Sequence, residues 1–255
     1  MINDWVIIQR SGDVIPEVVK PVLDKRENNT DKLKPIIFPD NCPSCNSKLV
    51  EIKDEAAIRC TESWLCPAQR KEMIWHFASK YAMNIDGLGR KQVGILVDKD
   101  LIKTPADLYT LDKNDLVKLD RFGDLSAKNL LEAINNSKNT TLTRFIISLG
   151  IREVGRVMAE QLAEHLESLD NLMQASASEL VNIDSVGPRI AESIKSFFNN
   201  PKNMQTINEL INLGVNWPES SNTNKTNQTN SHPEITNKVF VITGSFTGYS
   251  RDELS

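Results

Sequence analysis

Ile85-Asp86-Gly87-Leu88-Gly89 is the first of four glycine-centred turns in the middle of this chain, and a helical pattern follows each of them. The other turns are Phe122-Gly123, Leu149-Gly150-Ile151 with Val154-Gly155, and Val186-Gly187-Pro188. A glycine between two helices accepts a positive φ and lets another backbone approach closely. The next helix then begins with unpaired N–H groups, which favour an anion. Four such turns suit a polymer with regularly spaced phosphates and therefore indicate nucleic acid.

Each turn taken alone has a second interpretation, because a glycine between helices is also a common helix C-cap. In that interpretation the apolar residues beside the glycines, such as Leu88 and Val186, only fill the core. Four turns within about a hundred residues favour nucleic-acid binding. Asp124 places an acid after the second turn, and Pro188 after the fourth lacks an N–H. We therefore expect the first and third turns to bind most directly.

The candidate DNA-binding residues in this region are the turn glycines and nearby cations. They are Gly87, Gly89, Arg90, Lys91, Gly123, Gly150, Arg152, Gly155 and Gly187. Further basic residues near the turns are Lys128, Arg156 and Arg189, and solvated helix surface also explains any single cation. The spacing from Gly87 to Gly150 is 63 residues and from Gly123 to Gly187 is 64, which indicates two similar pairs of hairpins.

The composition is that of an ordinary globular protein, with 40% hydrophobic and 25% charged residues among 255. Aromatic residues make up only 6%, which gives little support to a base-stacking surface for single strands. The net charge of −4 argues against binding DNA through bulk positive charge. No apolar run approaches the ~20 residues of a membrane span, and no signal-like stretch follows Met1. We expect a cytoplasmic protein. Because the sequence begins with a strand pattern and stops within another domain, we also expect a fragment.

The pattern of apolar residues changes along the chain. Strand-like residues 5–23 with Ser11-Gly12-Asp13 between them predict a β-hairpin. From about residue 71 to residue 214 apolar residues recur at helical spacing, as in Ile74, Phe77, Ala78 and Tyr81. Thr104 before Pro105 predicts a helix start. Residues 217–234 are rich in Asn, Ser and Thr and predict a flexible linker, and Lys238–Gly244 predicts a strand that meets a glycine turn.

The four cysteines are the second specific signal. Cys42, Cys45, Cys60 and Cys66 all lie within 25 residues, and the rest of the chain has none. Two close pairs separated by a short loop can bring four thiolates to one tetrahedral Zn²⁺. Two disulfides or four reduced core cysteines are the alternatives, and the absence of a signal sequence disfavours disulfides. Structural zinc is favoured over catalytic zinc because four thiolates leave no open position.

These features, in this order, resemble one family, the bacterial NAD⁺-dependent DNA ligases. The resemblance covers almost the whole chain. The segments that carry it are Arg10–Pro16, the four cysteines, Cys66–Glu72, Asp86–Gly89, Thr104–Tyr109 and Leu149–Gly155. It implies a multidomain, mainly α architecture with a β remnant of an OB-fold and a truncated α/β domain. The implied parts are residues 1–24 as the end of an OB-fold, 25–38 as a linker, 39–70 as a four-Cys zinc finger, 71–214 as a domain of four helix-hairpin-helix motifs, 215–236 as a flexible linker and 237–255 as the start of a BRCT domain.

By the same resemblance, this chain supplies the DNA clamp of an enzyme that seals nicks in duplex DNA during replication and repair. Arg10 would face DNA near the nick. The family forms its AMP adduct on a Lys-x-Asp-Gly motif, which this chain lacks; Asn84-Ile85-Asp86-Gly87 has Asn in the place of the nucleophile. No catalytic residue is therefore assigned. We expect one structural Zn²⁺ per chain, and NAD⁺ and Mg²⁺ used by the full-length enzyme but not bound here.

The expected partner is nicked duplex DNA, and the expected state is a monomer in the bacterial cytoplasm, associated with the nucleoid. Two other classes stay open. The first is a non-enzymatic helix-hairpin-helix scaffold of DNA repair, from which an upstream adenylation domain would distinguish a ligase. The second is a zinc-containing protein-interaction protein that docks through its BRCT end, which absence of DNA binding at low salt would favour.

Overall fold

A computed structural model of the chain describes residues 1–12, 15–26, 33–51, 57–119 and 122–218. The chain divides into two units, Met1–Trp217 and Pro218–Ser255. The predicted BRCT start lies outside the described residues, as does all but the first part of the predicted linker before it. None of the described helices combines the length and the apolarity that crossing a membrane requires.

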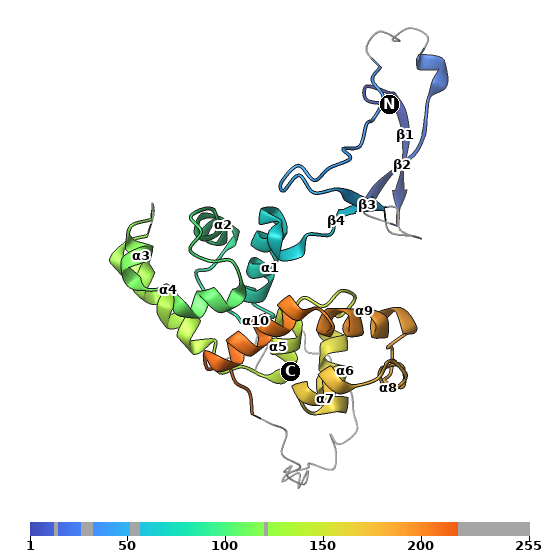
Figure 1. Cartoon of the computed structure of the whole chain (residues 1–255). Coiled ribbons are helices and arrows are strands. Elements are labelled where there is room, and N and C mark those ends of the chain that lie inside the picture. The colour runs from blue at the N-terminus through green and yellow to red at the C-terminus, as the bar shows by residue number, and fades with distance from the viewer. Residues whose placement is uncertain (13–14, 27–32, 52–56, 120–121, 219–255) are drawn as a thin grey trace, which may run out of the picture. The chain divides into compact units, whose positions relative to one another are not determined.

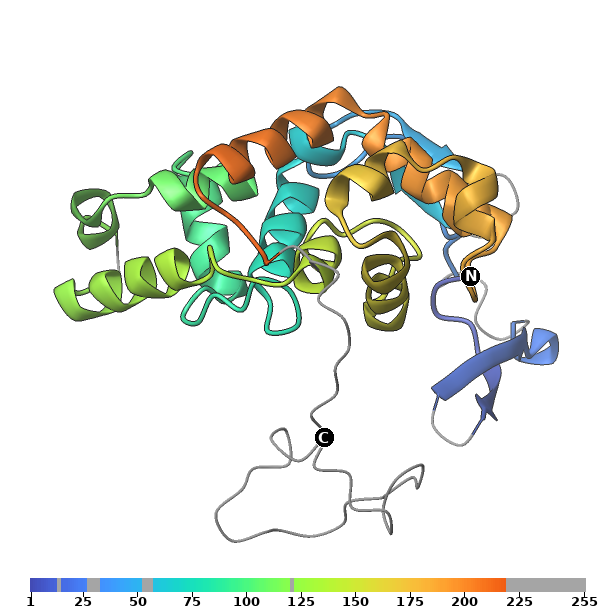
Figure 2. The same ribbon diagram turned by 90° about the horizontal axis from the view of Figure 1, so that it is seen from below.

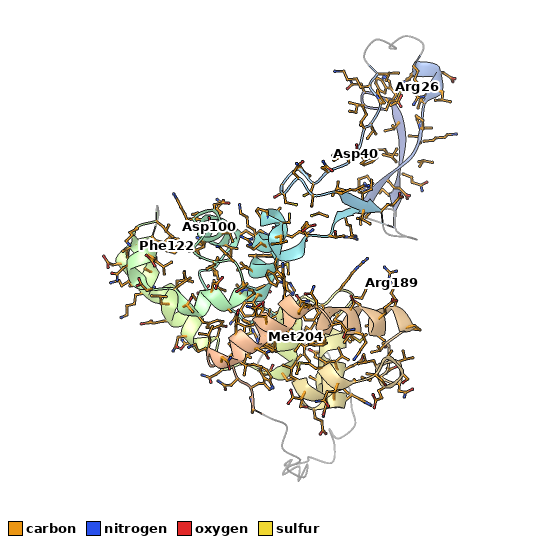
Figure 3. The ribbon with its side chains drawn as sticks, in the orientation of Figure 1. Arg26, Asp40, Asp100, Phe122, Arg189 and Met204 are labelled. Atoms are coloured by element: carbon orange, nitrogen blue, oxygen red, sulfur yellow. The ribbon has the colours of Figure 1, made fainter. Side chains whose placement is uncertain are left out.

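The prediction of two N-terminal strands is confirmed, whereas residues 13–14 of the predicted turn lie outside the described residues. β1 (Val6–Ser11) pairs with β2 (Ile15–Pro21) in an antiparallel ladder with an irregularity between Ile7 and Ile8. The short 3₁₀ helix η1 (Leu23–Lys25) follows, and Arg26 lies directly after it (Figure 3). The Arg26 guanidinium donates to the Asp4 carboxylate, and this hydrogen bond holds the pKa of Asp4 well below its usual range. A two-stranded sheet is at best marginally stable by itself, and most of the apolar side chains of this one are exposed.

The cysteine-rich region contains a second small antiparallel ladder, in which β3 (Leu49–Glu51) pairs with β4 (Ile58–Cys60). The 3₁₀ helix η3 (Ser63–Leu65) connects this ladder to the first long helix. That helix, α1 (Pro67–Ala78), begins one residue after the last cysteine. Its N-terminal proline suits a first helical position, where the N–H has no partner within the helix.

The rest of the described chain is helical, as the spacing of apolar residues predicted. The helices are α2 (Arg90–Asp98), η4 (Pro105–Thr110), α3 (Lys113–Val117), α4 (Asp124–Asn136), α5 (Leu142–Ser148), α6 (Arg156–Leu166), α7 (Leu169–Gln174), α8 (Ala177–Val181), α9 (Pro188–Phe198) and α10 (Pro201–Asn212). Helices α1, α5 and α10 lie in the middle, with α2 to α4 on one side and α6 to α9 on the other (Figures 1 and 2).

One buried cluster of apolar side chains runs through all these helices. Ile74, Phe77 and Ala78 belong to it, as the helical spacing predicted. Tyr81 differs from the prediction, because α1 ends at Ala78 and the Tyr81 side chain is 61% exposed. Helical periodicity has no meaning beyond the last helical residue. The predicted helix start at Thr104 is found, with Asp107 accepting hydrogen bonds from the N–H groups of Lys103 and Thr104.

Candidate metal centre and nucleic-acid interface

The four cysteines converge, as their spacing predicted. Their Sγ atoms all lie within 4.8 Å of one another. Cys42 and Cys66 Sγ are 3.9 Å apart, and Cys45 and Cys60 Sγ are 3.5 Å apart. Four thiolates around Zn²⁺ at about 2.3 Å have S···S separations of about 3.8 Å, so these positions fit the metal. The separations are far beyond the ~2.05 Å of a disulfide bond, which rules out the disulfide alternative in this structure.

The backbone around the first cysteine pair forms a tight knuckle. Cys42 N–H donates to Ser47 O at 2.7 Å, and Asn46, with φ 61°, donates to Cys42 O at 2.8 Å. The Ser47 hydroxyl lies 2.9 Å from Cys45 Sγ. This side-chain hydrogen bond, together with the Ser47 N–H, lowers the pKa of Cys45 to about 6. A thiolate, the form that binds Zn²⁺, is therefore favoured at neutral pH. Four cysteine ligands would fill all four positions of a tetrahedral Zn²⁺, so the site has no open position and is structural.

The cysteine cluster is bonded to the start of α1. The Ser44 hydroxyl accepts from the Ala68 N–H at 3.2 Å and so caps the helix from the knuckle. Gln69 Nε2 donates to Cys60 O at 2.6 Å, and Arg70 Nε donates to Trp64 O at 3.0 Å. The metal centre thus fixes the first turn of the helix that leads into the four hairpins.

The four predicted turns share one repeating frame of nine residues. It begins with Ile or Leu, has an apolar residue followed by glycine at its fourth and fifth positions, and ends with Val or Ala. The frames are Ile85 to Val93, Leu119 to Ala127, Ile151 to Ala159 and Ile183 to Ala191. In each, the N–H of the residue before the glycine donates to the carbonyl of the first residue at 3.0–3.4 Å. The N–H of the last residue donates to the glycine carbonyl at 2.9–3.1 Å.

This frame changes the register predicted from the glycine spacing. Gly123 and Gly187 are equivalent, as predicted, but the glycine equivalent to Gly89 is Gly155. Gly87 (φ 79°) occupies the position of Glu153 (φ 66°), and Gly150 (φ 64°) occupies that of Asn84 (φ 53°). Non-glycine residues occupy the left-handed conformation at both positions, so glycine identity does not mark equivalence there.

Three of the four frames bury the apolar residue, and three of the four expose the glycine. Leu88, Val154 and Val186 are at most 9% exposed, and Phe122, beside α3 and α4 in Figure 3, is half-buried. Gly89, Gly123 and Gly155 are exposed, and Gly187 is half-buried. The two interpretations of the turns are therefore compatible, because the apolar residue fills the core while the neighbouring glycine faces solvent.

The second helix of each hairpin differs from the neighbouring helices in how its N-terminus is capped. The helices α3, α5, α7, α8 and α10 have first-turn N–H groups bonded to the side chain of their N-cap residue; these N-caps are Asp112, Thr141, Ser168, Ser176 and Asn200. The second helices of the four hairpins, α2, α4, α6 and α9, begin instead at glycine N-caps with no side-chain cap; these N-caps are Gly89, Gly123, Gly155 and Gly187. Their first-turn N–H groups thus point out from an exposed turn, where an anion is favoured.

The charged groups at these turns differ between hairpins. Arg90 and Arg156 occupy the first position of α2 and α6, where they pair with Glu72 and Glu160, each at 2.9 Å. Asp124 occupies the first position of α4 and pairs with Lys113 at 2.6 Å, which lowers the pKa of Asp124 and keeps it charged.

The fourth hairpin starts with Pro188, and the third and fourth hairpins share an ion pair. Arg189, on the first turn of α9 (Figure 3), pairs with Glu153 at 3.2 Å, and Glu153 also lies 3.7 Å from Arg152. Of the remaining predicted residues, Lys91 is exposed on α2, and Arg10 is exposed on β1, opposite Pro16. Arg10 therefore lies on a different element from the hairpins.

Contacts between one hairpin and another were not predicted. His76 Nε2 lies 2.7 Å from Ile147 O, and a Cβ on Gly150 would be 3.3 Å from the His76 ring. Ser193 Oγ donates to Arg152 O at 2.8 Å, which joins the third and fourth hairpins. These residues are more than 40 positions apart, so no local signal could reveal them. The nine-residue frame, by contrast, could be found by aligning the sequence on the N-cap glycines.

The geometry thus defines a class of protein: a four-cysteine metal centre joined to a domain of repeated helix-hairpin-helix motifs. Comparisons with known proteins agree. The family described as NAD-dependent DNA ligase C4 zinc finger domain matches residues 41–68. The SAM-like helix-hairpin-helix tandem matches residues 79–136, and the helix-hairpin-helix motif matches residues 144–207.

A DNA ligase from Hahella chejuensis (strain KCTC 2396) is 47% identical over 252 residues, which are 99% of this chain and 36% of that protein. The chain thus spans about a third of the length of this curated relative. Over the segment that it spans, the chain is similar to this DNA ligase, and it contains the C4 zinc finger of NAD-dependent DNA ligases followed by helix-hairpin-helix domains. The matched zinc-finger family and the converging thiols together identify the cysteine cluster as a structural zinc site.

Proposed function

We propose that this chain is the DNA-gripping part of an NAD⁺-dependent DNA ligase that seals nicks in duplex DNA during replication and repair. The similarity to a DNA ligase over nearly the whole chain supports this role. The sealing reaction belongs to the longer protein, which would use NAD⁺ and Mg²⁺. This segment would bind neither and would hold only its zinc, through Cys42, Cys45, Cys60 and Cys66.

The observation that carries the proposal is the pattern of helix caps. Glycine N-caps without a side-chain cap occur at all four hairpin helices, on turns that face solvent. A side-chain cap would both satisfy the amides and occupy the place of an anion. Glycine leaves that place open, so that a phosphate of either strand can approach the backbone. Because every nucleotide has a phosphate, such binding is largely independent of sequence.

The hairpins would contribute unequally. The first and third combine open amides with an arginine at the first helical position, Arg90 and Arg156, and Lys91 follows in the first hairpin. In the second, the Asp124 carboxylate would repel phosphate. In the fourth, Pro188 removes one amide, and the Ile190 N–H already donates to Gly187 O at 3.0 Å. We therefore assign the strongest phosphate contacts to α2 and α6.

The zinc centre would act as a rigid support. It fixes the first turn of α1 through Ser44 and Gln69, and α1 in turn contacts Ile147 of α5 through His76, whose ring also lies beside Gly150. Arg10 on β1 would contact DNA near the nick. This part of the proposal rests on the family resemblance of Arg10–Pro16.

Binding to nicked and intact duplexes, measured by fluorescence anisotropy over a range of salt concentrations, tests the proposal. We expect binding to both duplexes, with log K falling linearly as log[salt] rises. Incubation with NAD⁺ is expected to give no enzyme–AMP adduct by mass spectrometry. Failure to bind duplex DNA at low salt would contradict the proposed clamp. Formation of an AMP adduct would contradict the proposal that this segment binds DNA but does not carry out adenylation.

The second candidate is a non-enzymatic repair scaffold with the same hairpins. It shares the DNA-binding prediction, so the reading frame upstream of this segment distinguishes the two; an adenylation domain there supports the ligase. We also propose that the protein is a monomer of the bacterial cytoplasm that associates with the nucleoid. Sedimentation of the purified chain tests the monomer, and a concentration-dependent rise in mass would contradict it.

A further inference from the structure

The most exposed large apolar side chains of the helical region lie near the hairpin turns. Among the described residues from 67 to 217, they are Leu125 (71% exposed), Val157 (67%) and Tyr81 (61%). Leu125 and Val157 both occupy the second position of a hairpin helix, two residues after the N-cap glycine. A single exposed apolar residue is ordinary, but this concentration around the proposed phosphate sites is not explained by packing.

The backbone on both sides of Tyr81 is fixed. From α5, Arg144 Nε donates to Ala82 O at 2.8 Å, and Arg144 Nη2 donates to Lys80 O at 2.6 Å. One guanidinium therefore binds the carbonyls before and after Tyr81. The Ala82 N–H also donates to Ser79 O at 3.0 Å. The aromatic side chain is exposed on a segment that is held in place, which reduces the entropy lost when it binds a partner.

Tyr81 also lies beside the third hairpin. The Arg156 guanidinium carbon is 5.9 Å from the centre of the Tyr81 ring, and Arg156 Nε bonds to Glu160 at 2.9 Å. Arg156 is the first residue of α6, Gly155 is its N-cap and Val157 follows. An aromatic ring and a cation therefore lie together at the open start of α6, where the exposed Val157 is the next residue.

We propose that Tyr81 and Val157 make an apolar contact with the deoxyribose walls of the DNA minor groove, next to the phosphate held at the start of α6. This inference rests on the proposed DNA-binding function. Neither side chain can distinguish base edges by a set of hydrogen bonds in the way that Asn or Arg does. Sugars are present at every nucleotide, so the contact adds affinity without sequence preference. Proteins that bind the minor groove commonly place apolar side chains there.

Salt dependence separates this contact from the phosphate contacts. Burial of apolar surface displaces no counterions, whereas each lost phosphate contact lowers the slope of log K against log[salt] by about one. Tyr81→Ala is therefore expected to weaken duplex binding on the order of ten-fold with an unchanged salt slope. Tyr81→Phe keeps the ring and should bind nearly as wild type. Val157→Asn, which replaces the aliphatic contact with a polar group, should weaken binding with the same unchanged slope.

Two comparison variants complete the experiment. Lys91→Ala, at an expected phosphate contact, should reduce both the affinity and the slope. Ile211→Ala removes a side chain that is 42% exposed on α10 and should change neither. Wild-type affinity of Tyr81→Ala, or a reduced slope that shows an effect through Arg156, would overturn the inference. If the wild-type chain binds no duplex at all, the proposed function itself fails, so the two failures are distinguishable.

Discussion

Trp64 and Asn203, which are 139 residues apart in sequence, are joined by a hydrogen bond in which indole Nε1 donates to Asn203 Oδ1 at 3.1 Å. The Asn203 amide also donates to Phe197 O at 3.0 Å. Trp64 lies two residues before the zinc ligand Cys66, and Asn203 is a buried residue of α10. This hydrogen bond attaches the C-terminal end of the metal-binding region to α10, the last described helix.

The first prediction concerns this attachment. Asn203→Ala removes the partner of Trp64 and the bond to Phe197 O, and it is expected to lower the free energy of unfolding by about 1–3 kcal/mol. Trp64→Phe removes the N–H donor but keeps an aromatic ring and leaves the bond from Asn203 to Phe197 O in place, so it should cost less. Chemical denaturation of the zinc-loaded chain measures both changes, with Gln205→Ala, on the exposed side of α10, as the control. Equal stability of Asn203→Ala and wild type would show that the contact does not hold the two regions together.

The second prediction concerns the metal. Metal analysis is expected to find one Zn²⁺ per chain, and Cys60→Ser should lower this content markedly because it removes a thiolate ligand. Ser47→Ala keeps the four thiols and should retain the zinc. Chelation should increase amide hydrogen exchange over residues 39–70, including Ala68 and Gln69 at the start of α1. Unchanged exchange after complete removal of zinc would contradict a structural role.

The third prediction separates two kinds of glycine. Gly150 has φ 64°, and a Cβ there would be 3.3 Å from the His76 ring, whereas Gly155 has an extended backbone and open space around it. Gly150→Ala is therefore expected to destabilise the fold by about 1–3 kcal/mol. Gly155→Ala should leave the unfolding midpoint close to wild type. If denaturant titrations show that both substitutions lower the free energy of unfolding equally, Gly150 and Gly155 do not differ in their structural role.

Sequence reasoning was most successful where local chemistry decides the structure. Cysteine spacing predicted the converging thiols, and glycine after an apolar residue predicted the hairpin turns. It was less successful where residues far apart in the sequence meet. The register of the repeat was misplaced because Gly87 and Gly150 were aligned by identity, although Glu153 and Asn84 adopt the same left-handed conformations.

The exposure of Tyr81 could not be predicted for a similar reason. Its spacing from Phe77 and Ala78 continues a buried stripe, but the helix ends first and Arg144, 62 residues from Ala82, fixes the segment that follows. The bond between Trp64 and Asn203 likewise has no local signal. Such contacts depend on how the helices pack, and the pattern of apolar residues specifies which face of a helix is buried but not which helix covers it.

If the glycine N-caps leave amides open for DNA phosphates, Gly155→Ser should close one of these sites with a side-chain cap. A serine N-cap would bond to the first-turn amides of α6 and stabilise the helix by a few tenths of a kcal/mol, without changing the charge of the chain. Gly123→Ser makes the same change at the second hairpin, where Asp124 already disfavours phosphate.

The decisive measurement is the duplex-binding affinity of these two variants, with their unfolding free energies determined in parallel. We expect Gly155→Ser to be at least as stable as wild type, to bind DNA clearly more weakly and to have a smaller salt slope. Gly123→Ser should have a smaller effect on binding. Wild-type affinity for Gly155→Ser with a demonstrably folded chain would contradict phosphate binding at the glycine N-caps.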